Sequence, residues 1–464
     1  MTEAARTETF SEAIAEFAAG FDPAMLKPGQ VRQCARALID TIAVAIAGRG
    51  DPAALRATDY ALPVIANLTP GSAELWGRGW FAAIEAATLH NGVAAHVLDY
   101  DDVSSPMSGH PSVALLPPLI ALGQARDLPG RRLASAYVVG FEVACRLGRA
   151  FGANHYDRGW HTTATVGTVA ATAACAHLIG LDAGAIVNAI GIAAAQTGGT
   201  RENFGTDAKS FQAGQCGAAA VRATLLADTG FTGASRAVDG KAGLFALYGA
   251  ESFEVIASER NCFGALPLEI DRTGIEIKKY PACYATHRPV DALLELQKEH
   301  SFEIEDIARL DVVTSGSGLA PLLKGRPATG TQGKFSLPYV LAAALLDGSV
   351  RLSSFTDRAV ARAAAHALFE KVHARESEAP MLPRWASLDV TLVDGRHMHR
   401  RIDALRGAPE NPLSDDELQQ KVADCLAWGG CDIDPATFVA AAFQLDEQPV
   451  RKVIDRMLAE TRTN

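Results

Sequence analysis

The sequence lacks most of the features that would assign it to a compartment or to a metal-binding class. Its eight cysteines include no CxxC pair, so neither a structural zinc site nor a disulfide framework is expected. The first residues, MTEAAR, lack the basic start and apolar core of a signal peptide, and no stretch reaches about 18 uninterrupted apolar residues. We therefore predict a cytoplasmic protein that spans no membrane.

Excess positive charge is absent as well. The 464 residues carry a formal net charge of −10, which gives no long-range attraction for nucleic acid or for an anionic membrane. The hydrophobic share of 48% and the charged share of 21% are typical of a soluble globular chain, and the length favours two domains over one. Neither nucleic acid nor membrane is expected as a partner, and any anion recognition must be local.

Motifs for organic cofactors and nucleotides are missing too. The chain has no GxGxxG after a predicted strand, no GxxxxGK[ST], no GxSxG and no HExxH. Nicotinamide, P-loop, hydrolase-elbow and zincin interpretations therefore have no motif support, and we predict no cofactor and no metal. Acid/base and anion-binding side chains are what the sequence offers instead.

Helical patterns dominate up to about residue 270, and the pattern then changes. Helices are predicted over 31–48, 80–96, 134–150, 163–179, 182–197 and 210–228, many of them rich in Ala and Gly. Strands are predicted over 275–277, 308–314, 386–393 and 397–402, and helices over 289–299 and 336–346. Asp394-Gly395 indicates a hairpin, and a capping box from Ser414 to Glu417 starts a last helix that runs to about Trp428.

These patterns predict a mainly α protein with an α+β second domain. Residues 1–270 and 406–464 would form a large helical domain, and residues 271–405 a smaller inserted α+β domain.

Three residues that can carry positive charge stand at the start of long helical patterns. They are His110, His161 and Lys209. The start of a helix already carries about half a positive charge, so a cation there is unfavourable unless an anion shares the space. We predict a binding site for a carboxylate or a phosphate.

An acidic group, Asp99, Asp101 and Asp102, follows an apolar helix that ends near His96. Three carboxylates within four residues repel one another, which indicates a cationic partner. A solvated helix end is the simpler interpretation. A metal site made of His96, Asp99 and Asp102 is a further hypothesis, which the spacing supports weakly.

Three other segments hold candidate residues. Tyr156 and His161 precede a helix of small residues, and His161 is either a general acid or base or a hydrogen-bonded core histidine. Arg201 and Lys209 flank Gly205 in a loop that could bind a ligand. Cys283 follows a basic stretch that begins at Lys278, and buried packing is the expected role of this thiol as well as of the Tyr339 ring.

In this order the segments resemble the MmgE/PrpD family over nearly the whole chain. The resemblance rests on LDYDD, GHPS, GWHTTATVG, NFGTDAKSFQAG, KKYPACYATH, and KFSLPY followed by LLDG. It implies a helical domain with a smaller α+β lid, a homodimer, and catalysis without an organic cofactor on a small di- or tricarboxylate. Members of the family include 2-methylcitrate dehydratases, cis-aconitate decarboxylases and iminodisuccinate epimerases.

The resemblance also implies roles for individual residues. Family active-site positions match Asp99, His110, His161, Lys209, Lys278 and Tyr339, and Tyr156 matches a tyrosine of the epimerase branch. We predict catalytic roles for Asp99, His110, Tyr156, His161 and Lys209. Substrate binding is predicted for Arg201, Lys278, Cys283 and Tyr339.

Two departures from the family pattern weaken the decarboxylase interpretation. Decarboxylating members carry a Thr where this chain has Val103 and a His where it has Cys283. The stretches PMSGHPS, HYDRGWH, RENFGT and KKYPACYATH most resemble the iminodisuccinate epimerase branch, so we favour epimerisation. Dehydration of a 2-methylcitrate type and cis-aconitate decarboxylation are the alternatives. A catalytically silent protein that binds a carboxylate is the remaining hypothesis.

Overall fold

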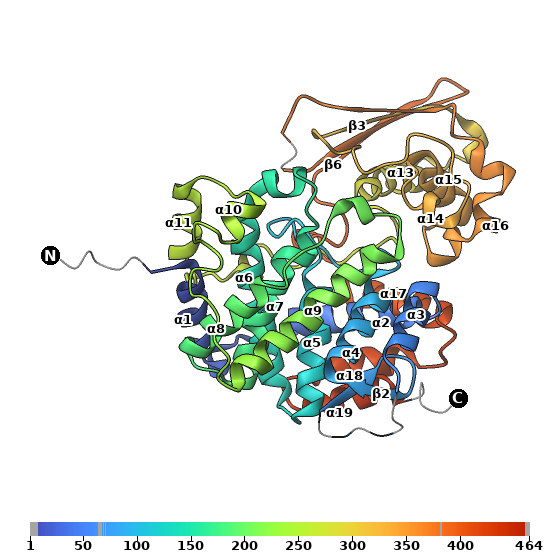
Figure 1. Cartoon of the computed structure of the whole chain (residues 1–464). Helices are drawn as coiled ribbons and strands as arrows, with labels where there is room; N and C mark the ends of the chain where they lie inside the picture. Colours follow the sequence, from blue (N-terminus) through green and yellow to red (C-terminus); the bar gives the residue numbers. More distant parts are fainter. Residues whose placement is uncertain (1–7, 64–66, 68, 70, 381–382, 460–464) are drawn as a thin grey trace. The chain divides into compact units, whose positions relative to one another are not determined.

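The computed structural model describes residues 8–63, 67, 69, 71–380 and 383–459, and it has two compact units (Figure 1). The first unit comprises residues 1–276 and 418–464, and the second comprises residues 277–417. The first is helical apart from one short hairpin, and the second is α+β, as the sequence predicted. The domain boundaries at 270/271 and 405/406 mark changes of sequence pattern, and we keep them as a proposal.

The helical unit is built almost entirely from consecutive helices. Its elements are α1 (Phe10–Gly20), α2 (Pro28–Gly48), α3 (Pro52–Tyr60), β1 (Ser72–Leu75), β2 (Trp80–Ala83), α4 (Ile84–His96), α5 (Pro111–Ala125), α6 (Gly130–Asp157), α7 (Thr162–Ile179), α8 (Ala183–Ala194), α9 (Asp207–Asp228), α10 (Leu244–Tyr248), α11 (Phe253–Asn261) and α12 (Glu269–Arg272). After the second unit the chain returns through α17 (Asp415–Trp428), α18 (Pro435–Ala442) and α19 (Val450–Met457).

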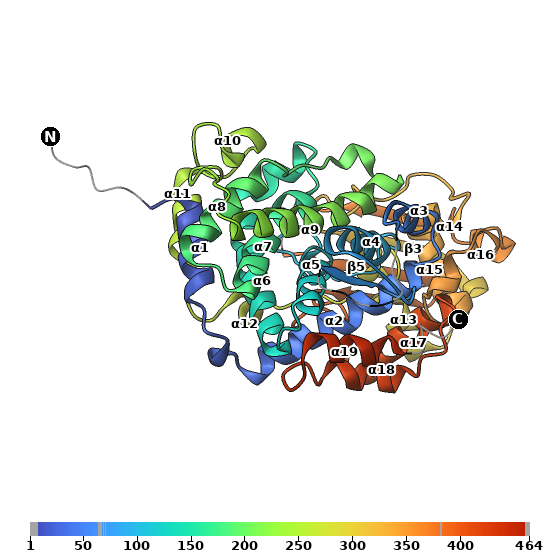
Figure 2. The ribbon, with the colours of Figure 1, turned by 60° about the horizontal axis from the view of Figure 1, so that its bottom comes forward.

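Helix α7 is the central element of this unit. It packs against α5, α6, α8 and α9, and both views show it among these helices (Figures 1 and 2). By length and composition Thr162–Ile179 could cross a membrane, but 94% of it is buried inside the protein. Its apolar character is therefore that of a core helix.

Small residues bring the helices that carry the site close together. A Cβ added to Gly92 of α4 would lie 2.5 Å from the Cα atom of Gly214 in α9, so these two helices cross with their backbones in contact. Gly167 of α7 also lies close to α5, because an added Cβ would be 2.8 Å from the Ala114 side chain. The Ala- and Gly-rich helices therefore pack closely, and this packing fixes how the helix ends are spaced.

A break in α6 positions one candidate residue. Gly152 has φ 67° and ψ −173°, so the helix stops there and a last short turn carries Tyr156. A side chain at this position would collide with the Glu251 carboxylate. Glycine is therefore required both for the left-handed φ and for the close approach.

The α+β unit packs helices against a mixed four-stranded sheet. Its elements are α13 (His287–His300), β3 (Ile307–Thr314), α14 (Gly330–Gly333), α15 (Leu337–Asp347), α16 (Asp357–Val360), β4 (Val372–Glu376), β5 (Ala386–Leu392) and β6 (His397–Ile402). The strand order is β4-β3-β5-β6, with β3 parallel to β4 and the other pairs antiparallel. The hairpin predicted at Asp394-Gly395 is confirmed, since it joins β5 to β6.

Two predictions of secondary structure are wrong in detail. The segment predicted as a helix from residue 80 begins with strand β2, which pairs with β1, and α4 starts only at Ile84. Residues 275–277 make no strand beyond a single bridge between Glu276 and Val103. Lys209, which was expected at the start of a helix, lies in the first turn of α9, whose cap is Thr206.

Candidate functional site

The residues after α4 bring the predicted acidic group into contact with two of the three predicted cations. Asp99 has a left-handed backbone, with φ 54°, which turns the chain sharply after α4. Its Oδ1 atom accepts a hydrogen bond of 2.6 Å from Lys209 Nζ and lies 3.9 Å from His110 Nε2. These three side chains keep 13–17% of their surface exposed, so a small solute can reach them.

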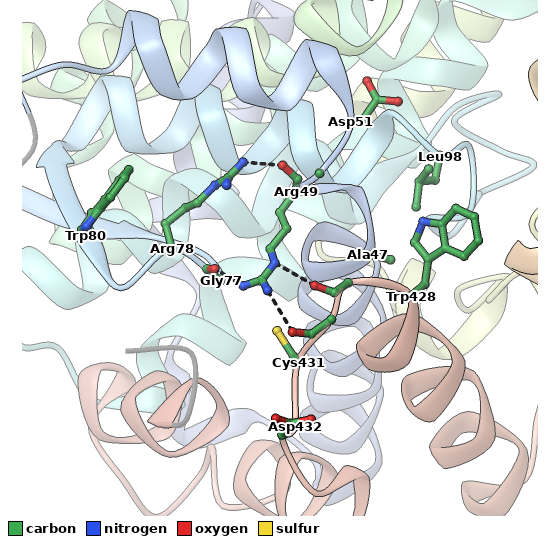
Figure 3. A pocket seen from close by; sticks show the side chains of 13 residues that line it. Ala47, Arg49, Asp51, Gly77, Arg78, Trp80, Leu98, Trp428, Cys431 and Asp432 are labelled. Atoms are coloured by element: carbon green, nitrogen blue, oxygen red, sulfur yellow. Dashed lines mark hydrogen bonds between the residues drawn. The ribbon is translucent and has the colours of Figure 1, made fainter. Parts of the chain in front are cut away.

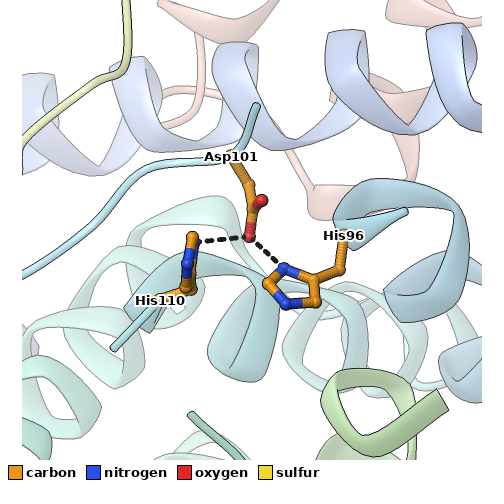
Figure 4. Close-up of side chains that lie close together, drawn as sticks. All are labelled: His96, Asp101 and His110. Atoms are coloured by element: carbon orange, nitrogen blue, oxygen red, sulfur yellow. Dashed lines mark hydrogen bonds and ion pairs between the residues drawn. The ribbon is translucent and has the colours of Figure 1, made fainter. Parts of the chain in front are cut away.

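Two imidazoles share the carboxylate of Asp101 (Figure 4). Its Oδ2 atom accepts a hydrogen bond of 2.8 Å from His96 Nδ1 and makes an ion-pair contact of 3.1 Å with His110 Nδ1. The rings of His96 and His110 meet edge to face, with centroids 4.7 Å apart. Lys209, Asp99, His110, Asp101 and His96 therefore form one continuous row of polar groups.

Burial and charge act in opposite directions on this row. Burial favours the neutral acid of Asp101, yet His110 and His96 hold its pKa well below the usual range. For His96 burial is the largest effect, and it lowers the pKa to about 4 despite the neighbouring Asp101. At neutral pH an ionised Asp101 therefore accepts a hydrogen bond from a neutral His96.

His161 is held in one tautomer. Its Nδ1 atom lies 2.7 Å from Oε1 of Gln212, whose amide nitrogen donates to the Thr200 carbonyl oxygen. Because that second bond fixes the amide orientation, Nδ1 carries the proton and Nε2 carries the lone pair. Burial, followed by the charges of His96 and Lys209, lowers the pKa of His161 well below its usual range. The imidazole at the start of α7 is thus neutral.

Asp102 does not join this row and instead binds the first turn of α5. It accepts hydrogen bonds from the backbone N–H of Ser112, at 3.2 Å, and from the Ser112 hydroxyl. It therefore caps α5 in place of His110, which occupies the cap position but makes no side-chain cap bond. This leaves the His110 imidazole available to contact Asp99 and Asp101.

The surroundings of Asp102 are fully buried. Burial is the main cause that raises its pKa well above the usual range, and the carboxyl group of Asp40 adds to the effect. Asp40 itself lies 2.5 Å from Lys421 Nζ of α17, which also donates to the Tyr100 carbonyl oxygen at 2.9 Å. We call Asp40, Asp102, Ser112 and Lys421 the buried network.

The structure pairs two further candidates. Arg201 donates to the backbone carbonyl of Tyr156 at 2.9 Å, and its guanidinium lies 3.9 Å from the centroid of the Tyr156 ring. The backbone N–H of His161 donates to the Gly199 carbonyl oxygen, so the loop that carries Arg201 is tied to the start of α7. Tyr156 and Arg201 thus act together, as a stacked pair.

The remaining candidates belong to the α+β unit. Lys278 and Cys283 are buried, and Tyr339 lies in the core of the unit, where its hydroxyl donates to the Ser354 carbonyl oxygen. Their substrate-binding roles stay predictions. All eight cysteines are free thiols, consistent with the expectation that no disulfide framework exists.

The alternative metal site of His96, Asp99 and Asp102 is not formed. Asp99 turns toward Lys209 and Asp102 caps α5, whereas His96, Asp101 and His110 bring three ligand atoms within 4.8 Å of one another. Two imidazoles and a carboxylate could hold a zinc or iron ion. The same distances also suit two imidazoles placed against one carboxylate, without an ion.

A cavity of about 860 Å³ lies elsewhere in the helical unit (Figure 3). Arg49 and Arg78 line it, but Arg49 donates to the carbonyls of Gly77, Gly429 and Gly430, and Arg78 donates to the Arg49 carbonyl. These bonds tie three chain segments together and use the charges structurally. The polar row from Lys209 to His96 is therefore the better candidate site.

Sequence reasoning missed Gln212, and it named Asp101 only as a member of the acidic group, without a role of its own. Gln212 lies three residues after Lys209, on the same face of α9, and this spacing could have revealed it. Asp101 lies in an irregular turn, where no periodicity shows which carboxylate meets His96.

Models of the N-terminal and C-terminal domains of MmgE/PrpD proteins match residues 12–255 and 280–431. The chain belongs to the MmgE/PrpD family. It is therefore an enzyme of this family, as the resemblance of its motifs predicted.

Three relatives within the family carry the same name. The cis-aconitate decarboxylase of Mus musculus is 29% identical over 97% of this chain and 93% of that protein. The enzyme of Homo sapiens is 28% identical over 91% and 89%, and that of Aspergillus terreus is 27% identical over 71% and 70%. These names indicate a lyase-type activity in the family and give no support to the expected epimerase branch.

Proposed function

We propose that this MmgE/PrpD enzyme moves a proton on a carbon next to a carboxylate of a small di- or tricarboxylate, without a cofactor. The observation that carries the proposal is the grouping of Lys209, His110 and His161 within the first turn or at the start of three helices. Each helix start adds partial positive charge, which favours an anion there. Phosphate is the weaker alternative, because the chain lacks nucleotide motifs.

Lys209 is the group that stabilises negative charge. Its ammonium is neutralised by Asp99 at 2.6 Å, and an incoming carboxylate would compete for the same donor. When a proton leaves the adjacent carbon, its electron pair spreads into that carboxylate as an enediolate. A fixed ammonium lowers the energy of this charge more than that of the ground state.

Two imidazoles serve as proton carriers. His110 takes the proton on Nε2, because its Nδ1 faces the Asp101 carboxylate, which stabilises the imidazolium that forms. His161 is the second carrier, and it is neutral in the free enzyme. A bound anion offsets the charge of Lys209, which raises the pKa of His161 and enables it to exchange a proton only in the complex.

Epimerisation is the reaction that we place first. In it His110 removes the proton from one face, and a proton returns to the opposite face. Tyr156, Val103 in place of Thr and Cys283 in place of His support this branch. Decarboxylation is the second candidate, favoured by the names of the relatives. In it the electron pair of the broken carbon–carbon bond passes toward a remaining carboxylate as carbon dioxide leaves, and the resulting carbanion is then protonated.

A cytoplasmic homodimer is part of the proposal. The family resemblance supports the dimer, and light scattering after gel filtration tests it. A mass of one 48.9 kDa chain would contradict it.

The proposed reaction is tested by proton NMR in heavy water. The purified enzyme is mixed separately with citrate, cis-aconitate, 2-methylcitrate and iminodisuccinate. Deuterium entry without net reaction indicates epimerisation, new alkene signals indicate dehydration, and loss of carbon dioxide indicates decarboxylation. Thermal stabilisation by an acid with no exchange in any acid would replace the proposal with a silent carboxylate-binding protein.

A further inference from the structure

We propose that Asp101 and His96 are positioning residues that hold His110 for proton transfer. The inference rests on the proposed function, since it assigns the groups behind one of its proton carriers. Neither residue is reached by the substrate, because both side chains have no exposed surface. They act through His110, which does keep an exposed edge.

The geometry fixes which nitrogen of His110 faces the reaction. Nδ1 lies 3.1 Å from Oδ2 of Asp101, and Nε2 lies on the side of Asp99, 3.9 Å from its Oδ1. Although this ion-pair contact is not aligned as a hydrogen bond, an ionised carboxylate attracts an N–H and repels a nitrogen lone pair, so it favours the tautomer with the proton on Nδ1. Nε2 is then left with its lone pair on the side of Asp99 and Lys209.

His96 in turn fixes Asp101. It donates from Nδ1 to the same Oδ2 atom at 2.8 Å, and its ring lies 4.7 Å from that of His110 and 5.9 Å from that of His161. One neutral, buried imidazole therefore separates the two proton carriers and orients the carboxylate behind one of them. This pattern matches the carboxylate–imidazole pairs that orient a catalytic histidine.

The arrangement is costly for folding, which argues for a role beyond packing. Oδ1 of Asp101 and Nε2 of His96 are buried without a hydrogen-bond partner in the part of the chain that the structure describes. An ionised carboxylate with half of its acceptor capacity unused is unfavourable in a protein interior. A catalytic role is one of the explanations for a buried polar group without a partner.

Asp102 provides a matched control one residue away. It has the same side chain and is equally buried, but its raised pKa favours the neutral acid, and it contacts Ser112 rather than an imidazole. Asp101→Asn therefore removes a charge next to His110, while Asp102→Asn replaces a neutral acid with a neutral amide of the same shape.

The kinetic test compares these two variants on whichever of the four acids the wild type converts. Asp101→Asn should lower kcat by about tenfold to a thousandfold with KM changed less than about threefold, and should move the pH profile of kcat. His96→Asn keeps a hydrogen-bond donor near the Nδ1 position, so its kcat should fall less than that of Asp101→Asn. The kcat of Asp102→Asn should stay within about twofold of the wild-type value. Equal kcat values and pH profiles in Asp101→Asn and Asp102→Asn would overturn the inference.

A second readout needs no substrate. With ¹⁵N-labelled histidine, the Nδ1 signals of His96 and His110 should shift in Asp101→Asn and stay in place in Asp102→Asn. Unchanged signals in Asp101→Asn would overturn the positioning role even if the enzyme is active. If these signals shift while the wild type converts none of the acids, the proposed function fails and the contacts stand.

Discussion

Asp101 and Asp102 are neighbours in the sequence, both fully buried, and their surroundings are opposite in character. Asp101 faces two imidazoles, and its pKa is held well below the usual range. Asp102 belongs to the buried network with Asp40 and Lys421, and its pKa is raised well above that range. Both carboxyl groups are equally buried, so the neighbouring groups decide which of the two is ionised.

The comparison separates a reactive arrangement from a structural one. On the Asp101 side the row ends in Asp99, His110 and Lys209, which keep part of their surface open. On the Asp102 side Lys421 is 3% exposed and Asp40 is not exposed at all. Shifted pKa values occur on both sides, so a shifted pKa identifies a functional site only together with access to a ligand.

The largest effect is expected when the buried network is broken. Lys421→Met should lower the free energy of unfolding by about 3–5 kcal/mol, because Asp40 loses its ion-pair partner inside the protein. Urea denaturation followed by tryptophan fluorescence measures this. The double variant Lys421→Met/Asp40→Asn should regain much of the loss, and a double variant no more stable than the single one would contradict the assignment.

The second largest effect is expected for turnover when a proton carrier is removed. His161→Ala should lower turnover by at least about a hundredfold, since a proton carrier is lost, with little change in the urea midpoint. His177→Ala is the control, because His177 lies at the other end of α7 and bonds Ser135 and the Ala18 carbonyl oxygen. Turnover per folded molecule should be unchanged in this control. Comparable losses in both variants would remove His161 from the site.

The pH dependence of stability should distinguish the two carboxylates. A raised folded pKa means that the stability from Asp102 is fully present below its unfolded pKa, near 4, and is lost as the pH rises through the folded pKa. Relative to the wild type, the free energy of unfolding of Asp102→Asn should therefore rise as the pH increases above about 4, by up to about 1.4 kcal/mol per pH unit.

The pH dependence of stability expected for Asp101 has the opposite sign. Its depressed folded pKa gives stability that is present above the unfolded pKa and is lost as the pH falls through the folded pKa. Between about pH 5 and 8 the difference between Asp101→Asn and the wild type should hence be constant. Urea midpoints of both variants at several pH values give the two slopes, and parallel slopes would contradict the charge assignment.

The smallest effect is expected from metal removal. His96, Asp101 and His110 could bind an ion, but we assign their contacts to positioning. Dialysis against a chelator should leave turnover unchanged, with metal content measured before and after. Activity lost on dialysis and restored by zinc or iron would turn this row into a metal site.

Much of the fold could be predicted from the sequence, because apolar spacing and capping are local. The helix predicted over 31–48 is α2, and the box from Ser414 to Glu417 starts α17, with both reciprocal bonds formed. The strand β2 was missed because a short apolar run fits a strand as well as a helix start.

The site could be predicted only in part. The positive charge at the starts of three helices is a local feature, and it located His110, His161 and Lys209. Which carboxylate meets which imidazole depends on the left-handed turn at Asp99 and on where α4 and α9 cross, and neither follows from spacing.

The most direct test of the whole account is the rate of deuterium entry from heavy water into the substrate acid, measured side by side in Lys209→Ala and Asp102→Asn. We predict a rate at least about a hundredfold below the wild type in Lys209→Ala, because the charge on the enediolate is no longer stabilised. In Asp102→Asn we predict the wild-type rate per folded molecule. Equal rates in the two variants would contradict the division between a reactive and a structural side.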